Sequence, residues 1–101
     1  MKYKYEIHQI KNPKCNYRFL WWDQAKKDFD FSDYEKVYES EINGERENIV
    51  LETLFEIFNL YRPEDFKGHS LSVSDIIKLD DKYYYCDNSG WEDITKYISN
   101  K

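Results

Sequence analysis

Residues 75–86 read Asp-Ile-Ile-Lys-Leu-Asp-Asp-Lys-Tyr-Tyr-Tyr-Cys, and this stretch decides the kind of fold the chain can form. Two apolar runs, 75–79 and 82–86, are joined by Asp80-Asp81, a length that fits a tight β-hairpin. Successive tyrosines of the second run point to opposite faces, so both faces of that strand carry rings, as in a central strand. A hairpin at this point argues against a parallel doubly wound sheet.

Two segments upstream of the hairpin also have the periodicity of strands. Residues 3–8 alternate apolar with polar side chains, which predicts a half-buried strand, and Asn12-Pro13 ends it because proline cannot continue a ladder. Residues 34–42 predict a second strand with one largely charged face, which suits an edge strand. Asn43-Gly44 ends that strand, since both residues tolerate a positive φ.

Helices are predicted between and after these strands. The clearest covers residues 49–59, with Asn48 as its N-cap. Its apolar residues lie at i, i+3, i+4 and i+7 on one face: Leu51, Leu54, Phe55 and Phe58. A short helix is predicted within residues 18–27, and residues 91–98 predict a final helical turn or strand that closes the core. The expected class is α+β, a small and mostly antiparallel sheet with one or two helices packed on one face.

Length and composition set the limits of the molecule. The chain has 101 residues, of which 41% are hydrophobic and 19% aromatic, so we expect residues 1–101 to form a single domain with a ring-rich core. This composition excludes a disordered protein. No apolar run is long enough to span a membrane, and the first residues lead into no signal-peptide core. The expected location is therefore the cytoplasm.

Charge is distributed unevenly along the chain. Residues 1–27 carry a net charge of +5, residues 28–65 a net of −9, and the whole chain a net of −5. These segments can be two solvated faces that pair partly with each other, or an acidic surface that docks on a basic partner by imitating nucleic acid. The acids predicted to line such a surface are Asp28, Asp30, Asp33, Glu35, Glu39 and Glu41. The net acidity argues against direct nucleic-acid binding.

Residues that commonly bind metals are few and scattered. Cys15 and Cys86 have no CxxC spacing, and a cytosolic chain keeps such thiols reduced, so both are interpreted as small apolar side chains. His8 and His69 stand alone in the sequence. We therefore expect no metal site and no cofactor.

One run of residues resembles a known family signature. Residues 62–77 read Arg-Pro-Glu-Asp-Phe-Lys-Gly-His-Ser-Leu-Ser-Val-Ser-Asp-Ile-Ile, which is similar to the R-P-x-D-F-x-G-H-S-L-S-V-S-D pattern of the YodL-like domain. Residues 17–19, 34–38 and 84–91 resemble other family segments, so the likeness covers about residues 17–98. Residues 1–16 are then a basic N-terminal strand extension. The resemblance implies an origin in Gram-positive bacteria or their mobile elements, and it attaches no enzymatic activity to the domain.

The central motif has a structural interpretation and an enzymatic one. In the structural interpretation Gly68 supplies a backbone conformation that a side chain would forbid, and the hydroxyls of Ser70 and Ser72 satisfy nearby backbone groups. His69 can then bridge to a carbonyl or to Asp75, which anchors the turn before a strand. The same residue types occur in a hydrolytic triad, but no nucleophile elbow accompanies them. A small hydrolase that uses His69 is the less favoured alternative.

The expected function is therefore binding. Tryptophan and tyrosine dominate the energy of many protein interfaces, and Trp21, Tyr61 and Trp91 are the aromatic candidates for a contact surface with a protein partner. We expect a non-enzymatic protein-interaction domain that modulates a host protein. The alternative is an acidic anti-defence inhibitor of a phage or plasmid, for example an anti-CRISPR or anti-restriction protein that imitates nucleic acid. No membrane partner is expected.

Overall fold

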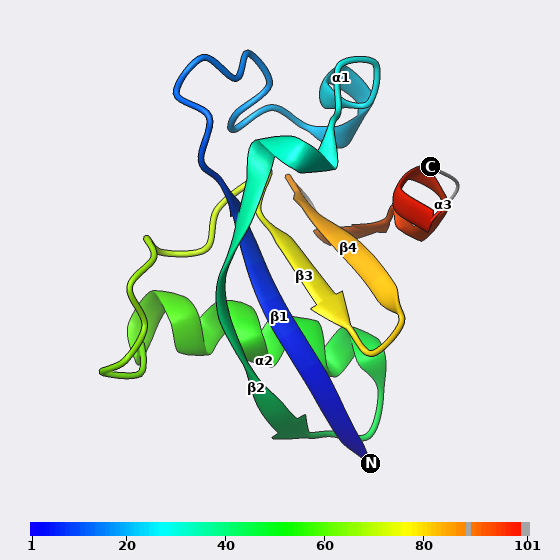
Figure 1. Ribbon diagram of the computed structural model, residues 1–101. Coiled ribbons are helices and arrows are strands. Elements are labelled where there is room, and N and C mark those ends of the chain that lie inside the picture. The colour runs from blue at the N-terminus through cyan, green and yellow to red at the C-terminus, as the bar shows by residue number, and fades with distance from the viewer. Residues whose placement is uncertain (89, 100–101) are drawn as a thin grey trace.

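The computed structural model describes residues 1–88 and 90–99. In this part of the chain, five strands form one antiparallel sheet in the order β2-β1-β3-β4-β5 (Figure 1). The strands are β1 (Lys2–Ile10), β2 (Tyr34–Asn43), β3 (Ile76–Leu79), β4 (Lys82–Asp87) and β5 (Gly90–Asp93). The helical elements are α1 (Trp22–Ala25), the short 3-10 helix η1 (Phe31–Asp33), α2 (Glu47–Leu60) and α3 (Thr95–Ser99). The α+β class and the antiparallel sheet are confirmed.

The first strand lies inside the sheet. On one side β1 pairs with β2 along its whole length, and on the other side Tyr5 to His8 pair with Leu79 to Ile76 of β3. The segment expected as a basic N-terminal strand extension, residues 1–16, thus contains β1, which pairs with strands on both of its sides. The edge position predicted for β2 is confirmed.

Helix α2 covers one face of the sheet (Figure 1). Its buried residues are Val50, Leu51, Leu54 and Phe58, and they pack against Tyr5 and Ile7 of β1 and Leu79 of β3. The ring of Phe58 meets those of Tyr5 and Phe66 edge-on. The sequence predicts Phe55 on the buried face of α2, but its side chain is 36% exposed. The buried residues of the helix include Val50 and Phe58, so the centre of the apolar face lies to one side of Phe55.

The opposite face of the sheet has its own apolar cluster. Tyr34 of β2 and Tyr85 of β4 pack there with Trp22 of α1 and Ile94, which precedes α3. The Trp22 ring lies 4.9 Å from that of Tyr85 and 5.0 Å from that of Tyr97. The sheet is therefore covered on both faces, by α2 on one and by short helices and loops on the other.

One predicted helix is shorter than the segment that indicated it, and one predicted helix end is wrong. The helix expected within residues 18–27 forms only over Trp22–Ala25, because Phe19 has a φ of 70° and gives its N–H to the Ser74 hydroxyl, 3.0 Å away, rather than to a helix. Asn48 is not the N-cap of α2, since the helix begins at Glu47. The hairpin is confirmed, and Asp80 at its turn has a φ of 52°. Part of the turn expected at 88–90 lies outside the described residues.

The buried face of α2 gives a first test of this fold. Leu54→Asp places a charge at a fully buried position and removes the apolar contacts that join helix to sheet, so it should abolish cooperative unfolding. Thr53→Asp, at an exposed position of the same helix, is the matched control and should change the melting temperature little. Thermal melts followed by circular dichroism measure both. A Leu54→Asp melt close to that of wild type would contradict the helix-on-sheet packing.

Candidate functional site

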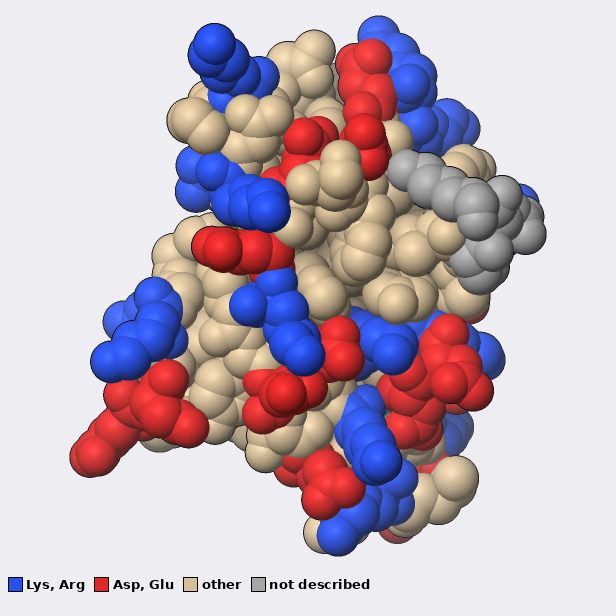
Figure 2. Space-filling view, in the orientation of Figure 1, with Lys and Arg blue, Asp and Glu red and all other residues tan. Residues whose placement is uncertain are grey.

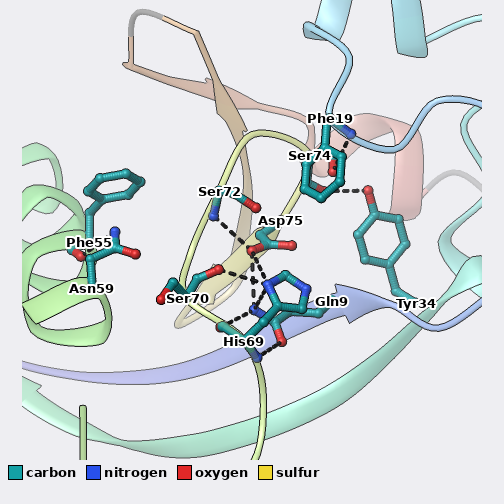
Figure 3. A network of polar contacts seen from close by, with 10 residues as sticks. All are labelled: Gln9, Phe19, Tyr34, Phe55, Asn59, His69, Ser70, Ser72, Ser74 and Asp75. Carbon is teal, nitrogen blue, oxygen red and sulfur yellow. Dashed lines mark hydrogen bonds and ion pairs between the residues drawn. The ribbon is translucent and has the colours of Figure 1, made fainter.

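The carboxylate of Asp75 is the centre of the motif that the sequence singles out (Figure 3). Its Oδ2 accepts the N–H of Ser72 at 2.9 Å and the side-chain amide of Gln9 at 3.2 Å. His69 Nδ1 lies 3.9 Å from the same oxygen. Asp75 itself is only 2% exposed and stands directly before β3. The predicted turn anchor is therefore present, and it lies in the interior.

Gln9 of β1 is the partner that the sequence analysis missed. Its side-chain nitrogen donates to the carbonyl of His69 at 2.8 Å, and its oxygen accepts the N–H of His69 at 3.2 Å. These two bonds attach the motif segment to the sheet. The sequence does hold a signal for this role of Gln9. It is a polar residue on the same face of the strand as Tyr3, Tyr5 and Ile7, which are buried.

Gly68 has a different role from the one predicted. Its φ is not in the left-handed region. A Cβ added at this position would lie 2.4 Å from Gln9 Oε1 and 2.9 Å from Phe66 Cζ. Glycine is therefore required because the motif segment passes too close to Gln9 for any side chain, rather than because of a special backbone angle.

The triad geometry is not assembled. His69 Nδ1 lies 2.8 Å from the carbonyl of Ser70, and since a carbonyl only accepts, Nδ1 carries the proton. The other ring nitrogen, Nε2, is buried without a hydrogen-bond partner among the described residues, and so is the hydroxyl of Ser72. The nitrogen that would act as base therefore has no nucleophile within hydrogen-bond reach.

Ser74 extends the motif to the far side of the sheet. Its hydroxyl accepts the N–H of Phe19, and its carbonyl accepts the hydroxyl of Tyr34 at 2.6 Å (Figure 3). Burial raises the pKa of the Tyr34 phenol, so that group keeps the proton it donates. Ser74 also has a φ of 86°. The motif thus holds the backbone of Phe19, which lies within residues 17–22, a segment that we call the aromatic loop.

The predicted aromatic contact residues lie in different environments. Trp21 is 52% exposed and Tyr61 is 70% exposed. Trp91 is half-buried, with its ring 6.3 Å from that of Phe55, and it lines an open groove of about 740 Å³ together with Leu51 and Tyr84. Trp21 and Tyr61 therefore offer more surface to a partner than Trp91 does.

Four of the predicted acids have partners within the molecule. The side chains of Asp30 and Asp33 accept hydrogen bonds from within the molecule, and Glu39 and Glu41 lie 3.1 Å from Lys36 and 3.6 Å from Lys2.

A β-bulge beside Val37 interrupts β2, the strand that carries Glu35, Glu39 and Glu41. Because the register shifts there, Glu35 pairs with Gln9 while Glu39 pairs with Glu6, and these partners face opposite sides of β1. Asp28 and Glu35 are exposed. The acids on β2 are thus shared between the two faces of the sheet.

Metal-binding geometry is not found in the described part of the chain, which holds no suitable group of three or more His, Cys, Asp or Glu side chains. Cys15 and Cys86 are both free thiols. Burial, assisted by the carboxylates of Asp75, Asp87 and Glu52, raises the pKa of the Cys86 thiol to about 12, so the thiol stays neutral. Within residues 1–88 and 90–99, no helix has the length and apolar character needed to cross a bilayer.

Gly68 provides a test of the motif's role. Gly68→Val should lower the free energy of unfolding by about 1–3 kcal/mol, because the new side chain displaces Gln9 and leaves buried polar groups unpaired. Urea unfolding measures this loss. Lys67→Val, at the exposed neighbouring position, is the control. Unchanged stability in Gly68→Val would mean that the close approach to Gln9 does not constrain the fold.

Asp75 makes stability depend on pH. Burial raises its pKa from 3.8 to about 6, while the hydrogen bonds from Ser72 and Gln9 and the electrostatic attraction of His69 oppose that rise. Between these values the folded state binds more protons than the unfolded state. The contribution of this carboxyl to stability therefore falls as pH rises from about 4 to about 6. Burial lowers the pKa of His8, which acts in the opposite direction.

The contribution of Asp75 is therefore measured as the difference between wild type and Asp75→Asn, in which His8 is unchanged. The free energy of unfolding of wild type should fall relative to that of Asp75→Asn as pH rises from 4 to 6. A difference that does not change with pH over this range would show that the carboxyl titrates normally in the fold.

Comparison with known proteins assigns the chain to a family. A model of the YodL-like domain matches residues 4–97, which include most of β1. The chain is 31% identical over 72 residues to a Bacillus subtilis (strain 168) protein described as "Uncharacterized protein YodL", an alignment that covers 64% of this chain and 69% of that protein. No solved structure matches the chain. The chain belongs to the family of YodL-like domains.

Proposed function

We propose that the chain is a non-enzymatic protein-interaction domain that modulates a host protein. The observation that carries this proposal is the contrast between its polar and its aromatic groups. The carboxylate of Asp75 and the amide of Gln9 are engaged inside the molecule. Trp21 and Tyr61, in contrast, keep more than half of their surface exposed.

The positions of these two rings favour binding. Trp21 directly precedes α1, and its carbonyl accepts the N–H groups of Gln24 and Ala25. Tyr61 follows the end of α2 beside Leu60, which is 69% exposed. Large rings on an ordered backbone contribute contact area at a small cost in conformational entropy. Such residues often supply most of the energy of a protein interface.

Two alternatives have weaker support. A hydrolase that uses His69 lacks a hydrogen-bonded nucleophile at the ring nitrogen that would act as base. An acidic anti-defence inhibitor would need a continuous run of negative charge. Figure 2 instead shows basic and acidic side chains interspersed over one face, and the bulge in β2 places Glu35 and Glu39 on opposite faces of the sheet.

A capture experiment separates the two binding hypotheses. Tagged protein is exposed to a lysate of Bacillus subtilis, the source of the similar protein, at low and at high salt, and retained proteins are identified by mass spectrometry. We expect a partner that persists at high salt and in the triple variant Glu35→Gln, Glu39→Gln, Glu41→Gln. The partner should be lost in Trp21→Ala or in Tyr61→Ala, because the contact is aromatic.

The opposite pattern would support the acidic inhibitor. Exposed charges are screened over about 10 Å at 0.1 M salt, so an electrostatic partner should be lost at high salt and in the triple variant. Thermal melts of every variant confirm that binding is compared between folded proteins. Failure of the wild-type protein to retain any specific partner at either salt concentration would contradict the proposed function.

A further inference from the structure

The aromatic loop is held in place by three separate parts of the molecule. Its bonds begin with the Tyr17 hydroxyl, which donates to Asp33 Oδ2 at 2.9 Å. The N–H of Phe19 donates to the Ser74 hydroxyl, and the carbonyl of Leu20 accepts the Tyr85 hydroxyl at 2.6 Å. The N–H of Trp22 donates to Asp87 Oδ1 at 3.1 Å. The motif and β4 therefore bind the backbone of the loop, and η1 binds its Tyr17 side chain.

The side chains of this loop are divided between interior and exterior. Tyr17 is 2% exposed and Trp22 4%, whereas Phe19 is 55% exposed and Trp21 52%. The two inward rings anchor the loop in the second apolar cluster. The two outward rings are fixed by the same backbone and remain in contact with solvent.

Phe19 has an unfavourable backbone conformation. Its φ of 70° lies in the left-handed region. Glycine and asparagine adopt this region readily, whereas a bulky residue is strained there. The residue that holds it, Ser74, also has a positive φ. Strain of this kind persists where the surrounding structure enforces it, and it is concentrated at sites that bind or react. Here the result of the strain is an exposed phenyl ring.

The segment that carries this ring is basic. The Arg18 guanidinium lies 4.9 Å from the centre of the Phe19 ring. Residues 11–27 contain five basic residues, all exposed, and a single acid, Asp23, which lies 3.7 Å from Lys26. This segment has a net charge of +4, while the remainder of the chain has a net charge of −9. A short acidic segment of a partner complements the positive charge of residues 11–27. A long polyanion would also contact the acidic remainder of the chain, which would repel it.

We propose, on the basis of the protein-interaction function above, that Arg18, Phe19 and Trp21 form the contact surface for an acidic, apolar segment of a partner protein. Apolar side chains of that segment pack on the two outward rings, and a carboxylate pairs with Arg18. Ser74 is a positioning residue, because it holds the strained backbone of Phe19. The serine-rich motif therefore acts on binding through the aromatic loop.

The stability of Phe19 variants tests the strain. Asparagine tolerates a positive φ, whereas a β-branched residue does not. Phe19→Asn should melt at or above the wild-type temperature, and Phe19→Val should melt below it. Melting of Phe19→Asn well below wild type would show that the ring stabilises the fold, and it would overturn the inference even if a protein partner exists.

Binding is tested with defined probes. A peptide of alternating Glu and Leu is titrated into wild-type protein, and the Trp21 indole N–H is followed by NMR. We expect saturable shifts that weaken by about tenfold in Phe19→Asn and remain in Ile49→Asn, which changes an exposed apolar side chain of α2 outside the proposed contact surface. Ser74→Gly, which accepts the positive φ but lacks the hydroxyl, should also weaken binding while both outward rings are present.

Two control ligands complete the experiment. A peptide of alternating Lys and Leu and a single-stranded oligothymidine should both leave the Trp21 signal unchanged. No shift with the Glu-Leu peptide, or a stronger response to either control, would overturn the acidic-segment assignment. A partner captured from lysate that still binds Phe19→Asn would overturn this surface alone, and the protein-interaction function would stand.

Discussion

The pairing of β1 with β3 is the interaction on which the rest of the structure depends. It joins residues 5–8 to residues 76–79, and without it the β1–β2 pair and the hairpin would be separate ladders with no common sheet. Because side chains alternate along a strand, β1 also contributes to both cores. Ile7 is buried under α2, and Ile10 belongs to the cluster on the other face.

The end of β1 connects this pairing to the surface. Gln9 binds the motif at His69 and Asp75, and Ser74, one residue before Asp75, holds Phe19. A series of buried polar contacts thus runs from the central strand to an exposed ring. Buried networks of this kind specify a single arrangement when all their members are paired. The unpaired atoms in the network belong to His69 and Ser72.

Elements defined by local patterns could be predicted from the sequence, and elements defined by distant contacts could not. The hairpin and α2 have a clear periodicity and their own stop signals, so their positions were predicted within a few residues. The helix before Trp22 was overpredicted because Phe19 bonds to a residue 55 positions away. The role of Gln9 was missed for the same reason. The motif could be identified from its residues. Its burial could not be predicted, because it depends on contacts with β1, and the sequence of the motif does not show those contacts.

The bulge in β2 has a consequence for behaviour at high concentration. A long, regular strand at the margin of a sheet is a template on which other chains can add, and this is a route to amyloid-like aggregates. Here the shift beside Val37 breaks the regular spacing of backbone groups, and Glu35, Lys36 and Glu39 are exposed along the same strand. Charge and irregularity at this margin both oppose such growth. The acidic composition of the middle of the chain thus protects a ring-rich sheet against aggregation.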